Sequence, residues 1–470
     1  MPTLPARRLA VAALCAATLA APHAAPALPR SPLPTYFTSD NVSLVRNVPT
    51  GLGIGGKFHG RYYVQSIARA MGYRGPDQDA VSDGGIWVFD TIDPENPALV
   101  AHVPLPVWQN EDVDLSAKRK LLLVSNERRR ATAPGPAPVS QTPYLPGSLS
   151  VFDISDPTKP LPLSTIVMPA SVGTMPSGEP IPGPGHTASC VLDCEYVYMA
   201  GAKDGRVYVV DLRDPRNPSL MGSIATPAGD PTPVFTPGLV HDVNVDPYGN
   251  VWFAGSGGTV MYEPITDPMR PVVAATVSAA DNARTNHAIH HNTMRLDKHH
   301  VMISEEAYDS CGADEPATDD QPQGGRFQIW RIEKDAKRLV PVSLFQKKVP
   351  GIPVCSSHWM DVNAHQVVAD SFYEGGVRFL DIRDRTAMRQ VGWFRPSDGG
   401  AAQVVYVPGR PDLVYVSDFY RGLDVVRIDD GGAGAPTRSE TGEGGRPLVP
   451  LPPLEFANDE TFGYACRMPV

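Results

Sequence analysis

Apolar runs of strand length recur along the chain, separated by tight turns that contain Asp and Pro. In residues 205–227 (GRVYVVDLRDPRNPSLMGSIATP), an apolar run from Val207 to Val210 precedes an Asp-Pro turn at Asp214, and a second run begins at Ser219. β-Branched and aromatic residues favour strands, whereas Asp and Pro favour turns. Related segments begin at Gly84, Gly147, Gly257, Gly324, Gly375 and Gly422. The pattern therefore predicts seven copies of a strand–turn–strand unit.

Two more strands precede this unit in a complete repeat. Residues 186–193 (HTASCVLD) and 195–201 (EYVYMAG) show this most clearly. Four antiparallel strands repeated radially around an axis describe a β-propeller. The sequence thus predicts an all-β, seven-bladed β-propeller over residues 41–430.

The first strand of this region matches the last strand of a repeat. Residues 41–49 (NVSLVRNVP) align with residues 96–104 (NPALVAHVP), the outermost strand of the first repeat, whereas the last repeat stops after its third strand. We expect the N-terminal strand to complete the last blade and so close the ring, which removes exposed sheet edges.

The segments outside the propeller have different compositions. Residues 1–27 combine Arg7 and Arg8, an apolar run over residues 9–21 and a small-residue site at residues 25–27. This arrangement is typical of a secretory signal peptide and predicts a secreted, extracellular or periplasmic protein. Residues 431–470 are rich in Gly and Pro and are expected to form a C-terminal tail without a repeat.

The net charge bears on the class of partner, and the cysteines predict disulfides. The formal net charge is -10, and no long basic run occurs, which argues against a nucleic-acid partner. Export permits disulfides. We predict Cys190–Cys194 at a hairpin tip and Cys311–Cys355 between neighbouring blades, with Cys466 left over, although spacing does not fix connectivity.

Long Pro- and Gly-rich insertions gather on one side of the predicted propeller. They join the second and third strands of a blade, or the fourth strand to the next blade, and both loop types lie on the same face. We call this the looped face; the opposite face carries short turns. Variable loops usually mark the functional face.

Histidines recur at the start of the innermost strand, where it reaches the looped face. Aligning these starts brings together Glu111, His186, His241, His291 and His358. A one-residue shift in register would replace His291 by His290. Converging neutral imidazoles and a carboxylate suit one transition-metal ion such as Cu, Fe or Zn, with Glu111 as ligand or catalytic base.

Carboxylates end the second strands on the same face, and we expect them to orient the imidazole N–H groups. They are Glu305, Glu306, Asp370 and Asp418. Aromatic residues including Trp359 and Tyr373 either line a pocket there or, as is commoner, pack between blades. The alternative for each histidine is a structural hydrogen bond to neighbouring backbone.

The third strands carry the motifs IWVFD (residues 86–90), LSVFD (149–153), VYVVD (207–211) and VRFLD (377–381), which resemble the LVIVD-repeat family. Pro264, Arg331 and Arg427 replace the closing Asp in three repeats. The resemblance implies an exported bacterial β-propeller, often on the cell surface. The entrance histidines are similar in arrangement to those of unrelated metal-holding propellers, the four-histidine iron carotenoid oxygenases and copper methanethiol oxidase.

Two functions follow from these observations. The first is a binding module, outside the cell or on its surface, whose looped face engages a protein or small-molecule partner and whose axial histidines are structural or hold an ion. The alternative is a metal-dependent enzyme that acts on a small molecule at the propeller axis.

Overall fold

The chain folds almost entirely into β-strands, which confirms the predicted all-β class. The computed structural model describes residues 36–68, 84–105, 113–126, 129–130, 144–145, 147–170, 183–202, 205–225, 240–285, 289–307, 325–347, 352, 355–396 and 399–429. Among these residues the only helix is α1 (Ala279–Thr285). No helix in the described ranges has the length and hydropathy needed to cross a membrane.

Four of the sheets contain four strands each, and every strand is antiparallel to the next; three of these sheets are formed by strands of the first half of the chain. They are β3 (Leu52–His59), β4 (Tyr62–Ala68), β5 (Gly85–Asp90) and β6 (Ala98–Pro104); β7 (Val113–Ser116), β8 (Leu121–Asn126), β11 (Ser148–Asp153) and β12 (Leu161–Val167); and β13 (Ala188–Val191), β14 (Tyr196–Met199), β15 (Arg206–Asp211) and β16 (Ser219–Ala225). Two short strands, β9 (Arg129–Arg130) and β10 (Tyr144–Leu145), follow β8 and precede β11 along the chain and pair with each other.

An eight-stranded sheet consists of two such four-stranded units. They are β17 (Val240–Val245), β18 (Val251–Gly255), β19 (Gly258–Tyr262) and β20 (Val273–Val277), then β21 (Ile289–Arg295), β22 (His300–Glu306), β23 (Phe327–Glu333) and β24 (Arg338–Phe345). A short parallel pairing of β20 with β24 joins the units at their outer edges.

The N-terminal strands join sheets formed by the last strands of the chain. One sheet contains β25 (Met360–Val362), β26 (Val367–Ser371), β27 (Val377–Asp381) and β28 (Arg389–Pro396), with β1 (Tyr36–Thr38) added at its outer edge. The other contains β29 (Ala401–Val407), β30 (Arg410–Asp418) and β31 (Gly422–Ile428), and its outer strand is β2 (Val42–Val48). Val42 pairs with Ile428 across 386 positions of sequence, so the ends of the propeller region are held together.

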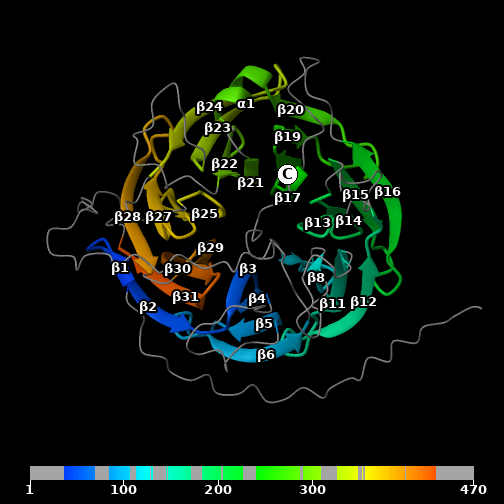
Figure 1. Cartoon of the computed structure of the whole chain (residues 1–470), viewed down its shortest axis with the longest axis horizontal. Helices are drawn as coiled ribbons and strands as arrows, with labels where there is room; N and C mark the ends of the chain where they lie inside the picture. The colour runs from blue at the N-terminus through cyan, green and yellow to red at the C-terminus, as the bar shows by residue number, and fades with distance from the viewer. Residues whose placement is uncertain are drawn as a thin grey trace, which may run out of the picture.

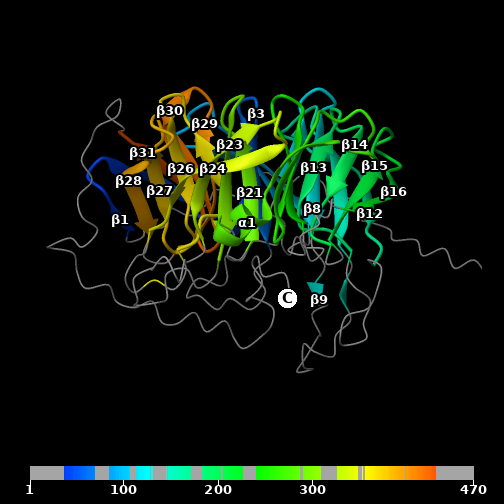
Figure 2. The same cartoon turned by 90° about the horizontal axis from the view of Figure 1, so that it is seen from above.

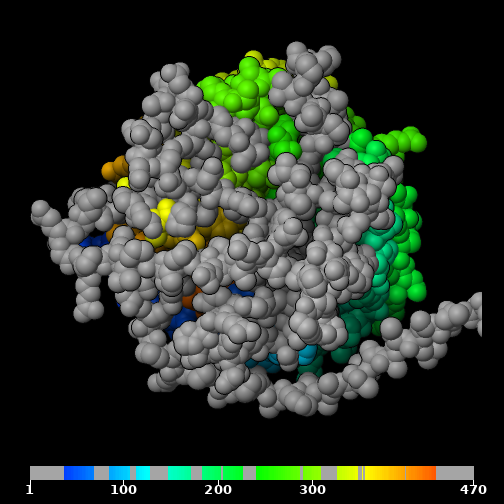
Figure 3. Space-filling model, viewed as in Figure 1, coloured from blue at the N-terminus to red at the C-terminus, as the bar shows by residue number. Residues whose placement is uncertain are grey.

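The sheets stand around a common axis, with β3, β13, β17, β21, β25 and β29 innermost (Figure 1). The strands run between the two faces of a thick disc (Figure 2), and the outer strands form its rim (Figure 1). In the space-filling view, residues from the middle of the chain, in teal and green, form the right-hand edge (Figure 3). Apolar residues of neighbouring sheets interdigitate to form the core. Tyr63 and Trp87 of the first sheet, for example, pack with Tyr415 and Leu423 of the last.

The recurring Asp residues explain the turns between third and fourth strands. The Asp that ends the third strand accepts a hydrogen bond from the backbone N–H two residues later, as in Asp153 to Ser155 (2.8 Å) and Asp211 to Arg213 (3.0 Å). The Asp of the Asp-Pro pair does the same, as Asp214 shows with Arg216 (3.0 Å). These Asx turns satisfy backbone donors and fix the hairpin geometry.

Candidate metal centre

Two of the predicted histidines occupy β-bulges at the start of their strands. In β17, Val240 pairs with Gly255 and Asp242 with Ala254, which leaves His241 as the extra residue. In β21 the partners of His290 and Asn292 are Glu305 and Ser304, which leaves His291 as the extra residue. A bulge re-aims the side chain that it carries, and here it turns both imidazoles toward a common point.

Four imidazoles lie in a row across neighbouring sheets, in edge-on or tilted contact with one another. Ring centroids are 4.3 Å apart for His186 and His241, 4.2 Å for His241 and His291, and 4.0 Å for His291 and His358. All four side chains are fully buried. The structure therefore brings together the four histidines that the repeat alignment selected, and they come from the starts of β17 and β21 and from the segments just before β13 and β25.

Glu306, the last residue of β22, adds a carboxylate to this row. Its Oε2 lies 3.8 Å from Nε2 of His241 and 3.9 Å from Nε2 of His291. The ligand atoms of these three buried residues all lie within 4.8 Å of one another. We had expected Glu306 to orient imidazoles from outside; the geometry instead makes it a candidate ligand.

Tyr373 holds Glu306 in this position. Its phenol donates a hydrogen bond to Oε1 of Glu306, and its ring lies 4.6 Å from that of His358 and is stacked on Phe419. Tyr373 has a left-handed backbone, with φ of 46°, which is unusual for a bulky residue. Such strain often accompanies a functional role. Sequence reasoning gave Tyr373 only a lining or packing role.

Backbone carbonyls orient two of the imidazoles. Nδ1 of His291 lies 3.1 Å from the carbonyl oxygen of His358, and Nδ1 of His358 lies against the carbonyl oxygen of Ala402. An imidazole that donates from Nδ1 carries its lone pair on Nε2. Ala402 is itself the extra residue of a bulge in β29, so this strand repeats the backbone feature without the histidine.

The donor set fits a borderline divalent metal. Two ligands at bonds of about 2.0–2.1 Å in tetrahedral geometry lie roughly 3.3 Å apart. Nε2 of His186 and Nε2 of His241 are 2.9 Å apart, and the His–Glu306 separations are slightly longer than this spacing. Small side-chain adjustments would let two histidines and a carboxylate share one ion.

His290 points away from this group. Its Nδ1 lies 2.9 Å from the hydroxyl of Thr259, and its ring edge faces Trp330. Burial lowers the pKa of His290 to about 3, so it is neutral at physiological pH. Of the two register alternatives, the structure therefore places His291 beside His241 and His358.

The other predicted carboxylates contact different groups. Glu305 lies 3.5 Å from Arg326, Asp370 accepts a hydrogen bond from Ser357 (3.0 Å), and Asp418 accepts one from the backbone N–H of Tyr420 (2.8 Å). Burial raises the pKa of Asp370, and burial likewise raises that of Asp418 to about 7. The groups that face Nδ1 of His291 and Nδ1 of His358 are backbone carbonyls rather than these carboxylates. Glu111 lies outside the described residues.

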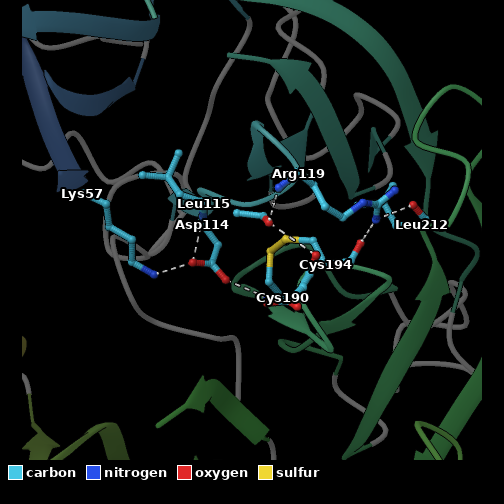
Figure 4. The surroundings of a disulfide bond; sticks show 9 residues. Lys57, Asp114, Leu115, Arg119, Cys190, Cys194 and Leu212 are labelled. Carbon is cyan, nitrogen blue, oxygen red and sulfur yellow. Dashed lines mark hydrogen bonds and ion pairs between the residues drawn. A yellow bond between two sulfur atoms is a disulfide. The ribbon is translucent and has the colours of Figure 1, made fainter. Parts of the chain in front are cut away.

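A disulfide joins Cys190 and Cys194 at the turn between β13 and β14 (Figure 4). The backbone N–H of Cys190 donates to Asp114 (2.7 Å), which also pairs with Lys57 (2.8 Å). Cys355 is disulfide-bonded, and its predicted partner Cys311 lies outside the described ranges, as does Cys466.

Comparison with known proteins identifies the fold. No family model matches the chain, and no curated protein matches it by sequence. The periplasmic gluconolactonase of Pseudomonas aeruginosa is 14% identical, with a TM-score of 0.53 over 80% of this chain and 95% of that one. A β-propeller domain from Myceliophteria thermophila is 11% identical, with a TM-score of 0.51 over 82% and 99%. A protein from Lactobacillus plantarum is 10% identical, with a TM-score of 0.51 over 76% and 88%. At such identities the likeness establishes a propeller-like fold alone.

Proposed function

We propose that this protein is a metal-dependent enzyme that acts on a small molecule at the axis of a β-propeller. One observation carries the proposal: His241, His291 and Glu306 present three buried ligand atoms to one point. Two histidines and a carboxylate leave coordination positions open for water or substrate, as in catalytic zinc and non-haem iron sites. His186 and His358 flank this group and are candidates for a further ligand.

The chain's own residues have separate roles in this proposal. His241, His291 and Glu306 bind the ion, and the backbone carbonyl of His358 fixes the tautomer of His291. Tyr373 positions Glu306 and can exchange a proton with it. A bound Cu, Fe or Zn ion would supply Lewis acidity or redox chemistry. Glu111, predicted at the same strand position, would be an additional ligand or base.

The enzyme proposal is favoured over the binding module by two features. A purely structural histidine needs only a hydrogen-bond partner, whereas here three ligand atoms of different strands converge. The proteins of similar structure also include an enzyme, the periplasmic gluconolactonase of Pseudomonas aeruginosa. A partner bound at the looped face remains a separate proposal.

The fold and location complete the proposal. We propose that the four-stranded units form a seven-bladed ring that β2 closes by pairing with β31. The resemblance of the third strands to the LVIVD-repeat family of exported β-propellers supports this architecture. We further propose that residues 1–27 are a signal peptide and that the mature protein acts in the periplasm or outside the cell.

Metal analysis tests the proposal. The mature protein, purified without chelators or a His tag, should contain close to one equivalent of a transition metal per chain, and a His241→Ala/His291→Ala variant should contain none. His300→Ala is the matched control, because His300 pairs with Asp297 at the turn between β21 and β22, at the opposite end of these strands from His291 and Glu306. Retention of metal by the double variant, or its absence from reconstituted wild-type protein, would contradict the proposed site.

A second measurement separates an enzyme from a closed structural site. A catalytic metal with an open position should bind azide, with a change in the spectrum of the Cu(II)- or Co(II)-substituted protein. Turnover in ester, lactone and oxidase screens should then require the metal and Glu306. A metal that binds but does not respond to azide would favour a structural ion.

A further inference from the structure

A cavity of about 430 Å³ lies between the innermost strands of five neighbouring units. Its walls come from β3, β17, β21, β25 and β29, which surround the axis (Figure 1). Two of these, β17 and β21, contain His241 and His291 near their starts, and β25 begins two residues after His358. The cavity therefore occupies the same axis as the candidate metal centre.

The inner end of the cavity adjoins the histidine row. Asn292 and Trp359 line it, and each directly follows a histidine of that row. The ring of Trp359 lies 6.3 Å from that of His291, edge to face, and its side chain is nearly buried. One layer of side chains thus separates the cavity from the imidazoles.

The other end opens away from the histidines. Val245 and Pro247 line the cavity there, and Val245 is 39% exposed. Val245 follows His241 by four residues, which corresponds to roughly 13 Å of strand. The mouth therefore lies on the face of the short turns, next to the turn at Asp246.

The walls are chiefly apolar, and their cations already have partners. The apolar lining residues are Val245, Trp252, Met294, Trp359, Met360, Val362, Val404 and Val405. Lys57 pairs with Asp114 (2.8 Å), and Arg295 lies 3.3 Å from Asp246. An anionic ligand would lose hydration and find these cations already paired.

The cavity wall also offers hydrogen-bond acceptors. The Asp361 carboxylate accepts hydrogen bonds from the backbone N–H groups of Val362 (2.8 Å) and Tyr406 (2.8 Å), which leaves lone pairs for a ligand donor. Burial raises the pKa of Asp361 to about 6. An apolar pocket with a few such polar groups suits a small ligand with one hydrogen-bonding end.

We propose that this axial cavity binds a mainly apolar small molecule that carries a hydrogen-bond donor and no negative charge, such as an alcohol, and admits it from the face of the short turns. The further step, that this molecule is the substrate, rests on the proposed metal-dependent function. Binding of the molecule to the cavity does not rest on that function and can be measured on metal-free protein.

Three probes of matched size test the ligand class. They are 2-phenylethanol, the anion phenylacetate and the cation 2-phenylethylammonium, titrated into metal-free protein at pH 7.5 and followed by ligand-observed NMR. We expect the alcohol and the ammonium probe to bind at least tenfold more tightly than phenylacetate, because only they carry a donor for Asp361. Equal or tighter binding of phenylacetate would overturn the proposal.

A cavity-filling variant tests the place of binding. Val405→Phe should weaken binding of 2-phenylethanol at least fivefold, whereas Val340→Phe, at an equally half-buried position on the outer strand β24, should not. Circular dichroism checks that both variants fold, and Val362→Met serves as a second, milder filling variant. Undiminished binding by folded Val405→Phe or Val362→Met would overturn the proposal.

The metal content distinguishes failure here from failure of the proposed function. Protein that binds 2-phenylethanol in the cavity but no metal supports the ligand site and overturns its role as a substrate site. Protein that binds metal but not the probe overturns the ligand site and leaves the metal centre standing.

Discussion

The phenol of Tyr373 donates a hydrogen bond to Oε1 of Glu306, while Oε2 of the same carboxylate lies 3.8 Å from Nε2 of His241. One side chain from the turn after β26 thereby fixes the orientation of a candidate ligand from β22. Hydrogen bonds to ligand carboxylates commonly set metal affinity because they hold the ligand in place before the ion arrives.

Replacing Tyr373 by Phe should weaken metal binding by about 10- to 100-fold. The ring can still stack on Phe419, so packing is retained and only the hydrogen bond to Glu306 is lost. Competition with a chromogenic chelator would measure the change. Tyr198→Phe is the control, since Tyr198 donates to the carbonyl of Pro268 and lies away from the histidine row. An equal loss of affinity in both variants would show a general structural effect.

Adjacent histidines should behave differently when replaced. His291→Gln should lower the metal content to near zero, because His291 contributes a donor atom to the candidate site. His290→Gln should retain the metal, because its ring faces Thr259 and Trp330. Elemental analysis of both purified variants checks the expectation. Loss of metal from His290→Gln alone would reverse the assignment of these two residues.

The sequence could predict the histidine row because its members share a repeat position, although the choice between His290 and His291 depends on the bulge in β21. His186, His241, His291 and His358 start equivalent strands, and the propeller-like arrangement brings such starts together. The roles of Glu305 and Glu306 could not be read in the same way. Successive strand residues point to opposite faces, so which of the two carboxylates faces His291 depends on a one-residue bulge that the sequence does not reveal.

The contact of Tyr373 with Glu306 could not be predicted, for a related reason. Its position depends on a left-handed backbone within the turn SFYEGG, and a tyrosine carries no sequence signal for that conformation. The Asp-Pro turns and the pairing of the N-terminal strand, by contrast, depend on local motifs that recur along the chain. Features set by repetition were therefore predictable, and features set by a single backbone irregularity were not.

Removing the Cys190–Cys194 disulfide should destabilise the protein without affecting the metal site. A cross-link that closes so short a loop stabilises by about 2 kcal/mol in the chain-entropy model. A Cys190→Ser/Cys194→Ser variant should therefore unfold at lower urea concentration, with unchanged metal content. Leu192, Asp193 and Cys194 all have left-handed backbones, and relief of this strain would reduce the loss. A fall in metal content at unchanged fold would contradict the prediction.

Asp418 should make the stability of the protein decrease between about pH 4 and pH 7. Burial raises the pKa of this carboxyl from its ordinary value of 3.8 to about 7 in the folded protein; Arg421 opposes the rise and Asp424 adds to it. Over that interval the folded state binds more protons than the unfolded state, so the free energy of unfolding falls as pH rises and levels off above pH 7. The Asp418→Asn variant cannot ionise at this position, so its stability should lack this fall with pH. The free energy of unfolding of the variant minus that of the wild type should therefore be larger at pH 8 than at pH 4, by more than about 1 kcal/mol. Urea unfolding of both proteins at a series of pH values measures the difference. A pH-independent difference would show that Asp418 has the same pKa in the folded protein as in the unfolded chain. The folded protein would then stabilise the carboxylate as well as water does.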